Sequence, residues 1–97
     1  MSPIAIVATV EVKPEFRQEF IDYLNSGLIA KSRAEAGNIQ YDLHQLLDNE
    51  NLFVIIENWS GAAAIEEHNA SAHFQAFVVF AEDKLVSLDI KQLKKIN

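Results

Sequence analysis

The chain has 97 residues, 49% of them hydrophobic, with a formal net charge of −6 and no cysteine. This length suits one compact domain with one core, so we expect a single domain over residues 1–97. An acidic chain without a basic face is a poor partner for nucleic acid, and the lack of cysteine excludes disulfides and thiolate chemistry and favours a reducing, cytoplasmic setting.

The first apolar run has the alternation of a β-strand. One parity is wholly apolar, and the other carries polar residues toward the end of the run, namely Thr9, Glu11 and Lys13; the apolar parity comprises Ile4, Ile6, Ala8, Val10 and Val12. This pattern predicts a strand over residues 4–13. The run is too short to cross a bilayer and no basic segment precedes it, so we expect neither a membrane anchor nor a signal peptide.

A helix is expected directly after this strand. Pro14 suits a first helical turn, and Glu15 places negative charge near the positive end of the helix dipole. Apolar residues then recur at three- and four-residue steps, namely Phe16, Phe20, Tyr23, Leu24 and Leu28. Gly37 is expected to end the helical segment in a left-handed conformation.

The next segments predict a hairpin, two short helices and a last strand. Alternating runs over residues 39–47 and 52–59 flank the turn-forming Asp48-Asn49-Glu50-Asn51. Ser60 and Ser71 are each expected to cap a helix, the second with an apolar stripe. The stripe comprises Phe74, Phe77, Val78 and Ala81, and alternation from Val86 to Lys91 predicts the final strand.

This order of elements predicts an α+β fold of the ferredoxin-like βαββαβ kind, an antiparallel four-stranded sheet with its helices on one face. The third strand is apolar on both sides, with Val54 and Ile56 on one and Phe53 and Ile55 on the other. An uncovered apolar sheet face exceeds what monomers usually expose. We therefore expect a homodimer that pairs through its sheets.

No standard cofactor motif is present: the chain lacks a glycine-rich phosphate loop, a nucleophile elbow and a dinucleotide fingerprint. We therefore expect no cofactor. Polar residues that periodicity does not explain gather between the third strand and the second helical region. They are Glu57, Asn58, Trp59, His68, Asn69, Ser71 and His73.

His68 and His73 have two interpretations. A helix break between them means that they need not share a face, and no acidic residue stands at a recognised companion spacing, so no metal site is expected. As structural residues they would cap or pack near helix ends. As functional residues they would be acid–base or hydrogen-bonding groups at a pocket wall.

Two interpretations are also open for each of Glu57, Trp59 and Tyr41. The Glu57 carboxylate lies in an apolar strand and needs a partner, for which Arg33 is a candidate. Without a partner it has a raised pKa and can act as a general acid or base. Trp59 is either a core residue or a substrate platform. Tyr41 and His44 fall on opposite faces of the second strand, so the Tyr41 hydroxyl belongs either to the core or to a cavity.

Four blocks of the sequence form a familiar pattern. They are Val12-Lys13-Pro14 followed by Phe20, then Ser32-Arg33-Ala34-Glu35-Ala36-Gly37-Asn38 with Tyr41, then Asn51-Leu52-Phe53 leading to Glu57-Asn58-Trp59, and His68-Asn69-Ala70-Ser71-Ala72-His73-Phe74 with Phe77. With these blocks the chain resembles the antibiotic-biosynthesis monooxygenase (ABM) domain family, in its small quinol-monooxygenase-like branch. The resemblance covers nearly the whole chain.

The resemblance implies a dimeric α+β barrel with a pocket between sheet and helices. It also implies a monooxygenase that oxidises a small aromatic quinol or phenol with molecular oxygen and needs no metal, flavin or haem. On this interpretation His68 or His73 is the base or oxygen-anion donor, and Tyr41 and Glu57 orient the substrate. The remaining substrate-binding residues are Trp59, Phe74, Phe77, Asn58 and Ser71.

Haem degradation is disfavoured, because Val7, His68 and Val78 stand where the haem-degrading relatives carry asparagine, tryptophan and histidine. The same scaffold and the His-x4-His block also look like an autoinducer-processing isomerase of a small hydroxy-ketone phosphate. A non-catalytic small-ligand-binding stress protein is the third alternative. The shortage of basic residues near the expected pocket favours the quinol over the phosphorylated substrate.

Overall fold

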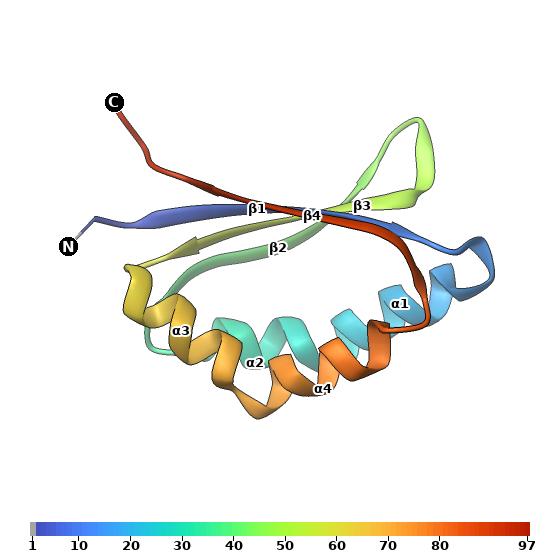
Figure 1. The fold of residues 1–97 in the computed structure, drawn as a ribbon, viewed down its shortest axis with the longest axis horizontal. Coiled ribbons are helices and arrows are strands. Elements are labelled where there is room, and N and C mark those ends of the chain that lie inside the picture. Colours follow the sequence, from blue (N-terminus) through green and yellow to red (C-terminus); the bar gives the residue numbers. More distant parts are fainter. Residues whose placement is uncertain (1) are drawn as a thin grey trace.

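The computed structural model describes residues 2–97 as one antiparallel sheet with helices on one face (Figure 1). The strands are β1 (Ile4–Val12), β2 (Asn38–Leu46), β3 (Asn49–Trp59) and β4 (Leu85–Leu93). Their order in the sheet is β2-β3-β1-β4, so the first and third strands in sequence pair at the centre. This order confirms the ferredoxin-like prediction.

Two helical crossovers cover the sheet. The first contains the 3-10 turn Pro14–Phe16, α1 (Arg17–Tyr23), the π-helical turn Leu24–Leu28 and α2 (Ile29–Arg33). The second contains α3 (Ala62–Ala70) and α4 (Ala72–Ala81). The first crossover differs from the uniform helix predicted, because a π turn at Gly27 interrupts it. This turn still keeps Leu24 and Leu28 in the core.

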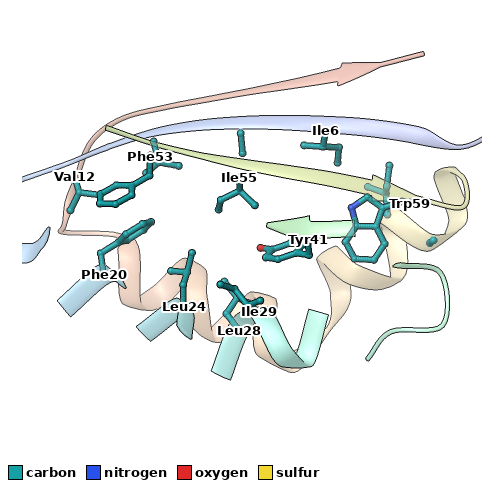
Figure 2. Close-up of a cluster of buried hydrophobic side chains, with 14 residues drawn as sticks. Ile6, Val12, Phe20, Leu24, Leu28, Ile29, Tyr41, Phe53, Ile55 and Trp59 are labelled. Atoms are coloured by element: carbon teal, nitrogen blue, oxygen red, sulfur yellow. The ribbon is translucent and has the colours of Figure 1, made fainter. Parts of the chain in front are cut away.

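The core lies between the helices and the inner face of β1 and β3. Val10 and Phe53 are opposite each other in the β1–β3 register, and both are buried. Phe20 packs beneath Phe53 with ring centroids 5.1 Å apart, as Figure 2 shows. The inner face of the sheet therefore forms one wall of the space between sheet and helices.

Two expectations about local structure are wrong. Gly37 does not adopt a left-handed conformation; a Cβ at Gly37 would lie 2.3 Å from the Cβ of Ala64, so glycine is needed for close packing. Ser60 does not cap α3, because the helix begins one residue later with Gly61 as its N-cap; the Ser60 amide donates to the Gly37 carbonyl. Ser71 does cap α4, and its Oγ accepts from the amide of Phe74 at 3.2 Å.

The helices leave the edge strand β4 uncovered. Val86, Leu88, Ile90 and Leu93 on this strand are about half exposed. On the outer face of the central strands, Ile56 lies opposite Val7. Among residues 2–97, no helix is long and apolar enough to cross a membrane.

Candidate functional site

A largely apolar cavity of about 450 Å³ lies between the inner face of the sheet and α4. Its volume falls within the range of small-molecule sites. Four of the residues predicted for the site line it: Tyr41, Glu57, Phe74 and Phe77. The other lining residues are Ala8, Val10, Ile55, Val78, Val79, Ala81, Glu82, Leu85, Leu88 and Ile90. The cavity thus presents an aromatic and aliphatic surface with few polar groups.

Glu57 is the buried carboxyl of this cavity. It lies on the inner face of β3, is 6% exposed, and accepts a hydrogen bond of 2.9 Å from the indole N–H of Trp59. Burial raises the pKa of Glu57 to about 7, the negative charge of Glu35 adds to the rise, and the Trp59 hydrogen bond opposes it. A carboxyl with this pKa exchanges protons readily near neutral pH.

The expected ion pair between Glu57 and Arg33 is wrong. The Arg33 guanidinium instead pairs with Asp42 at 2.7 Å and donates to the carbonyl of Tyr41 at 3.0 Å. Asp42 lies on the outer face of β2 and its side chain is 40% exposed. The Arg33 guanidinium therefore keeps most of its hydration beside Asp42, whereas it would lose this hydration beside the buried Glu57.

Tyr41 is the second polar group at the cavity. It is paired with Glu57 in the β2–β3 register and is 2% exposed. Burial raises the pKa of the Tyr41 phenol well above its usual range, and the charges of Glu57 and Glu35 raise it further. Tyr41 is therefore a neutral hydrogen-bond donor at physiological pH. Ser32 Oγ is buried and, within residues 2–97, meets no hydrogen-bond partner.

The two histidines meet on a residue that the sequence interpretation missed, Glu35. His68 Nδ1 lies 2.6 Å and His73 Nε2 lies 2.8 Å from the same Glu35 Oε2. The break at Ser71 between α3 and α4 lets the end of one helix and the start of the next face one carboxylate. Glu35 stands 33 and 38 residues from the histidines, so no local spacing indicated it; only its place in the block from Ser32 to Asn38 did.

The histidine cluster lies beside the apolar cavity, and neither histidine lines it. The His68 ring packs 4.5 Å from Trp59 and 5.7 Å from Tyr41, measured between ring centroids. His73 lines a second cavity of about 260 Å³ next to the π-helical turn, together with Lys31. The cluster therefore lies between the cavity residues and a second opening.

Three other predicted site residues have structural contacts. Trp59 is fully buried and positions Glu57 through its indole N–H. Asn58 lies on the outer face of the sheet and donates to the side chain of Gln40. Ser71 is the N-cap of α4. None of the three lines the apolar cavity.

Comparison with known proteins places this arrangement in a family. The family model described as antibiotic biosynthesis monooxygenase matches residues 3–79, which include β1 to β3, most of the helical segments and the histidine cluster. The chain belongs to this family.

Individual relatives agree with the antibiotic biosynthesis monooxygenase assignment. The chain is 46% identical over 82 residues to "Putative monooxygenase YcnE" of Bacillus subtilis, which covers 84% of this chain and 85% of the relative. It is 33% identical over 73 residues to "Putative monooxygenase Rv0793" of Mycobacterium tuberculosis, covering 75% and 70%. These names support a monooxygenase-like function.

Solved structures of relatives share the fold. PA3566 from Pseudomonas aeruginosa superimposes with a TM-score of 0.93 at 37% identity, covering all of this chain and 97% of that one. The structure of Rv0793 gives a TM-score of 0.92 at 26% identity, covering 99% and 97%. The antibiotic biosynthesis monooxygenase fold therefore extends beyond residues 3–79 to the last strand.

Proposed function

We propose that this protein is a monooxygenase that oxidises a small aromatic quinol or phenol with molecular oxygen and without a cofactor, in a homodimer. One observation carries the proposal. A carboxyl with a pKa of about 7, Glu57, stands opposite a neutral phenol, Tyr41, at the wall of a cavity that is otherwise aromatic and aliphatic.

Each part of the cavity suits one part of such a substrate. Phe74 and Phe77 supply surfaces against which a flat aromatic ring can stack. Glu57 and Tyr41 both line the cavity; in this proposal Glu57 accepts a phenolic proton, and Tyr41 donates a hydrogen bond to the oxygen that becomes negative. Trp59 is a positioning residue in this scheme, because it fixes the Glu57 carboxylate.

The reaction balances without an external reductant. Proton transfer to Glu57 leaves a phenolate, which passes one electron to oxygen to give a superoxide and substrate radical pair. Recombination forms a carbon–oxygen bond, and loss of water gives a hydroxyquinone from a quinol. One oxygen atom enters the product and the other leaves as water, and all four electrons come from the substrate.

His68 and His73 have a supporting role in this proposal. They hold Glu35, whose charge adds to the raised pKa of Glu57, and they do so from outside the apolar cavity. We propose that they position this carboxylate rather than contact the substrate. His73→Ala is expected to lower turnover about tenfold and to shift the pH at which the rate is half-maximal, which loss of packing alone would not do.

The lining of the cavity argues against the isomerase of a hydroxy-ketone phosphate. The described residues that line it include no lysine or arginine, whereas they do include the acidic Glu57 and Glu82. A phosphate group would therefore be held near two carboxyls without a cation. Binding a neutral aromatic substrate does not bring a negative charge close to these two carboxyls.

The test is oxygen uptake by the purified protein with a panel of hydroquinones, corrected for autoxidation. Wild type is expected to give saturable uptake that rises with pH through about 7, because Glu57 must be ionised to accept a proton. Glu57→Gln keeps the shape and the Trp59 contact but cannot act as a base, so it should lose at least about a hundredfold in kcat.

His44→Ala is the matched control, because His44 lies on the outer face of β2 and contacts only the Val54 carbonyl among the described hydrogen-bond partners. It should retain wild-type uptake. The absence of saturable oxygen uptake by wild type would overturn the oxygenase proposal. Stabilisation by the same hydroquinones without turnover would then support the ligand-binding alternative.

A further inference from the structure

We propose that Glu35, His68 and His73 form a binding site for a divalent transition-metal ion of the zinc class. The site is distinct from the apolar cavity, which none of the three residues lines. It does not depend on the proposed oxygenase activity. It also departs from the sequence expectation of no metal, which rested on the lack of an acidic residue near the histidines in sequence.

The three side chains supply the right donor atoms. Two imidazole nitrogens and one carboxylate oxygen are ligands that zinc, cobalt and related ions prefer in proteins. The three donor atoms lie within 4.8 Å of one another. His68 Nδ1 and His73 Nε2 point to one Glu35 oxygen, at 2.6 Å and 2.8 Å, so both imidazoles already present a nitrogen to a common point.

A movement of the Glu35 side chain would admit an ion. Ligands about 2.0–2.1 Å from a tetrahedral zinc ion stand about 3.3 Å from each other. The nitrogen-to-oxygen distances are shorter than this by about half an ångström, because hydrogen bonds now join these atoms. An outward shift of the Glu35 carboxylate, together with adjustment of the two imidazoles, would open the site, and the Glu35 side chain is 16% exposed in the turn after α2.

The surroundings favour a cation. Glu35 pairs with no lysine or arginine within residues 2–97, and its ion-pair partners there are the two histidines. The neighbouring Arg33 is taken by Asp42. The Glu57 carboxyl interacts with Glu35 through charge and adds negative potential. A divalent ion would offset this concentration of negative charge.

The fold also provides rigidity and access. The ligands come from three segments, the α2–β2 turn, α3 and α4, and the buried His68 ring is held among Trp59 and Phe74. His73 lines the cavity of about 260 Å³ beside the π-helical turn. That cavity leaves room for water to complete the coordination of an ion held by three protein ligands.

The experiment uses the full, untagged chain after treatment with a chelator. Titration with CoCl2 is expected to produce the visible absorption of four- or five-coordinate cobalt and to saturate at one ion per chain. When added in excess, ZnCl2 should displace the cobalt and raise the Tm by about 5 °C or more, because the ion binds the folded chain. Neither readout requires turnover, so failure here leaves the oxygenase proposal standing.

Three variants locate the site. Glu35→Gln and His73→Ala should each weaken cobalt binding at least tenfold, and His44→Ala should bind as wild type. If Glu35→Gln fails to fold, His73→Ala tests the metal site, because the His73 side chain is partly exposed. Absence of cobalt absorption in wild type, or binding unchanged in His73→Ala, would overturn the proposal. An equal loss in His44→Ala would do the same.

Discussion

At the scale of single residues, the decisive feature is a carboxyl that the fold buries. Glu57 continues the inner-face alternation of β3, where apolar side chains are the rule. Within residues 2–97, the hydrogen bond to its side chain comes from Trp59, two residues along the same strand. The strand thus carries a proton-exchanging group and its positioning partner on one face, and burial rather than a cation sets the pKa.

This burial predicts how stability depends on pH. The folded pKa of Glu57, about 7, lies above the ordinary value of 4.5, so the folded state binds the proton more tightly. The contribution of Glu57 to stability is therefore complete below pH 4.5 and is lost as pH rises to about 7. Glu57→Gln removes this loss, so at pH 8 the variant should be more stable than wild type by up to roughly 3 kcal/mol.

Urea unfolding of wild type and Glu57→Gln at pH 5 and pH 8 measures this difference. The gap between them should be clearly smaller at pH 5 than at pH 8. A gap that is the same at both pH values would contradict the raised pKa.

At the scale of elements, glycine occupies two positions for opposite reasons. One lies in the first crossover and the other in the turn after it. Gly27 lies in the π-helical turn, and a Cβ there would meet nothing within 4 Å. Gly37 precedes β2, and a Cβ there would collide with Ala64 of α3. The first glycine marks a local irregularity of the helix, and the second allows the second crossover to pack closely.

The two glycines therefore predict opposite effects of alanine. Gly27→Ala should stabilise the protein by about 0.5–1 kcal/mol, because it restricts the unfolded chain without strain. Gly37→Ala should destabilise it by about 1–3 kcal/mol through overpacking, and adding Ala64→Gly should recover part of the loss. Thermal unfolding of the three variants tests this, and an equal effect of both single substitutions would refute the packing argument.

At the scale of the whole molecule, the sheet has one covered face and one uncovered face (Figure 1). The helices cover β1, β2 and β3 from one side, and two of the exposed apolar residues of β4, Leu88 and Ile90, border the cavity. On the outer face, Val7, Val54 and Ile56 form an apolar stripe between polar residues of the edge strands. A second copy of the chain is the occupant that we propose for this stripe.

Light scattering after gel filtration should therefore give about twice the 10.9 kDa of the chain. Ile56→Lys places a charge in the middle of the stripe and should shift the protein to the monomer. Leu47→Lys is the control, because Leu47 is fully exposed in the β2–β3 turn, away from the stripe. A monomeric wild type, or a dimer that survives Ile56→Lys, would exclude pairing through this face.

Sequence by itself determined the order of the elements and the family. Strand alternation, the proline after β1 and the Ser71 cap are local patterns, because each depends on neighbours within a few residues. The four motif blocks needed no coordinates either, and they contain Tyr41, Glu57, His68 and His73.

Only the tertiary structure decided what these residues do to one another. It brought Glu35 to both histidines across 33 and 38 residues, paired Arg33 with Asp42 instead of Glu57, and separated the histidines from the apolar cavity. The physical reason is that periodicity is a property of neighbours along the chain. Burial, charge environment and donor geometry depend on which distant segments the fold places together.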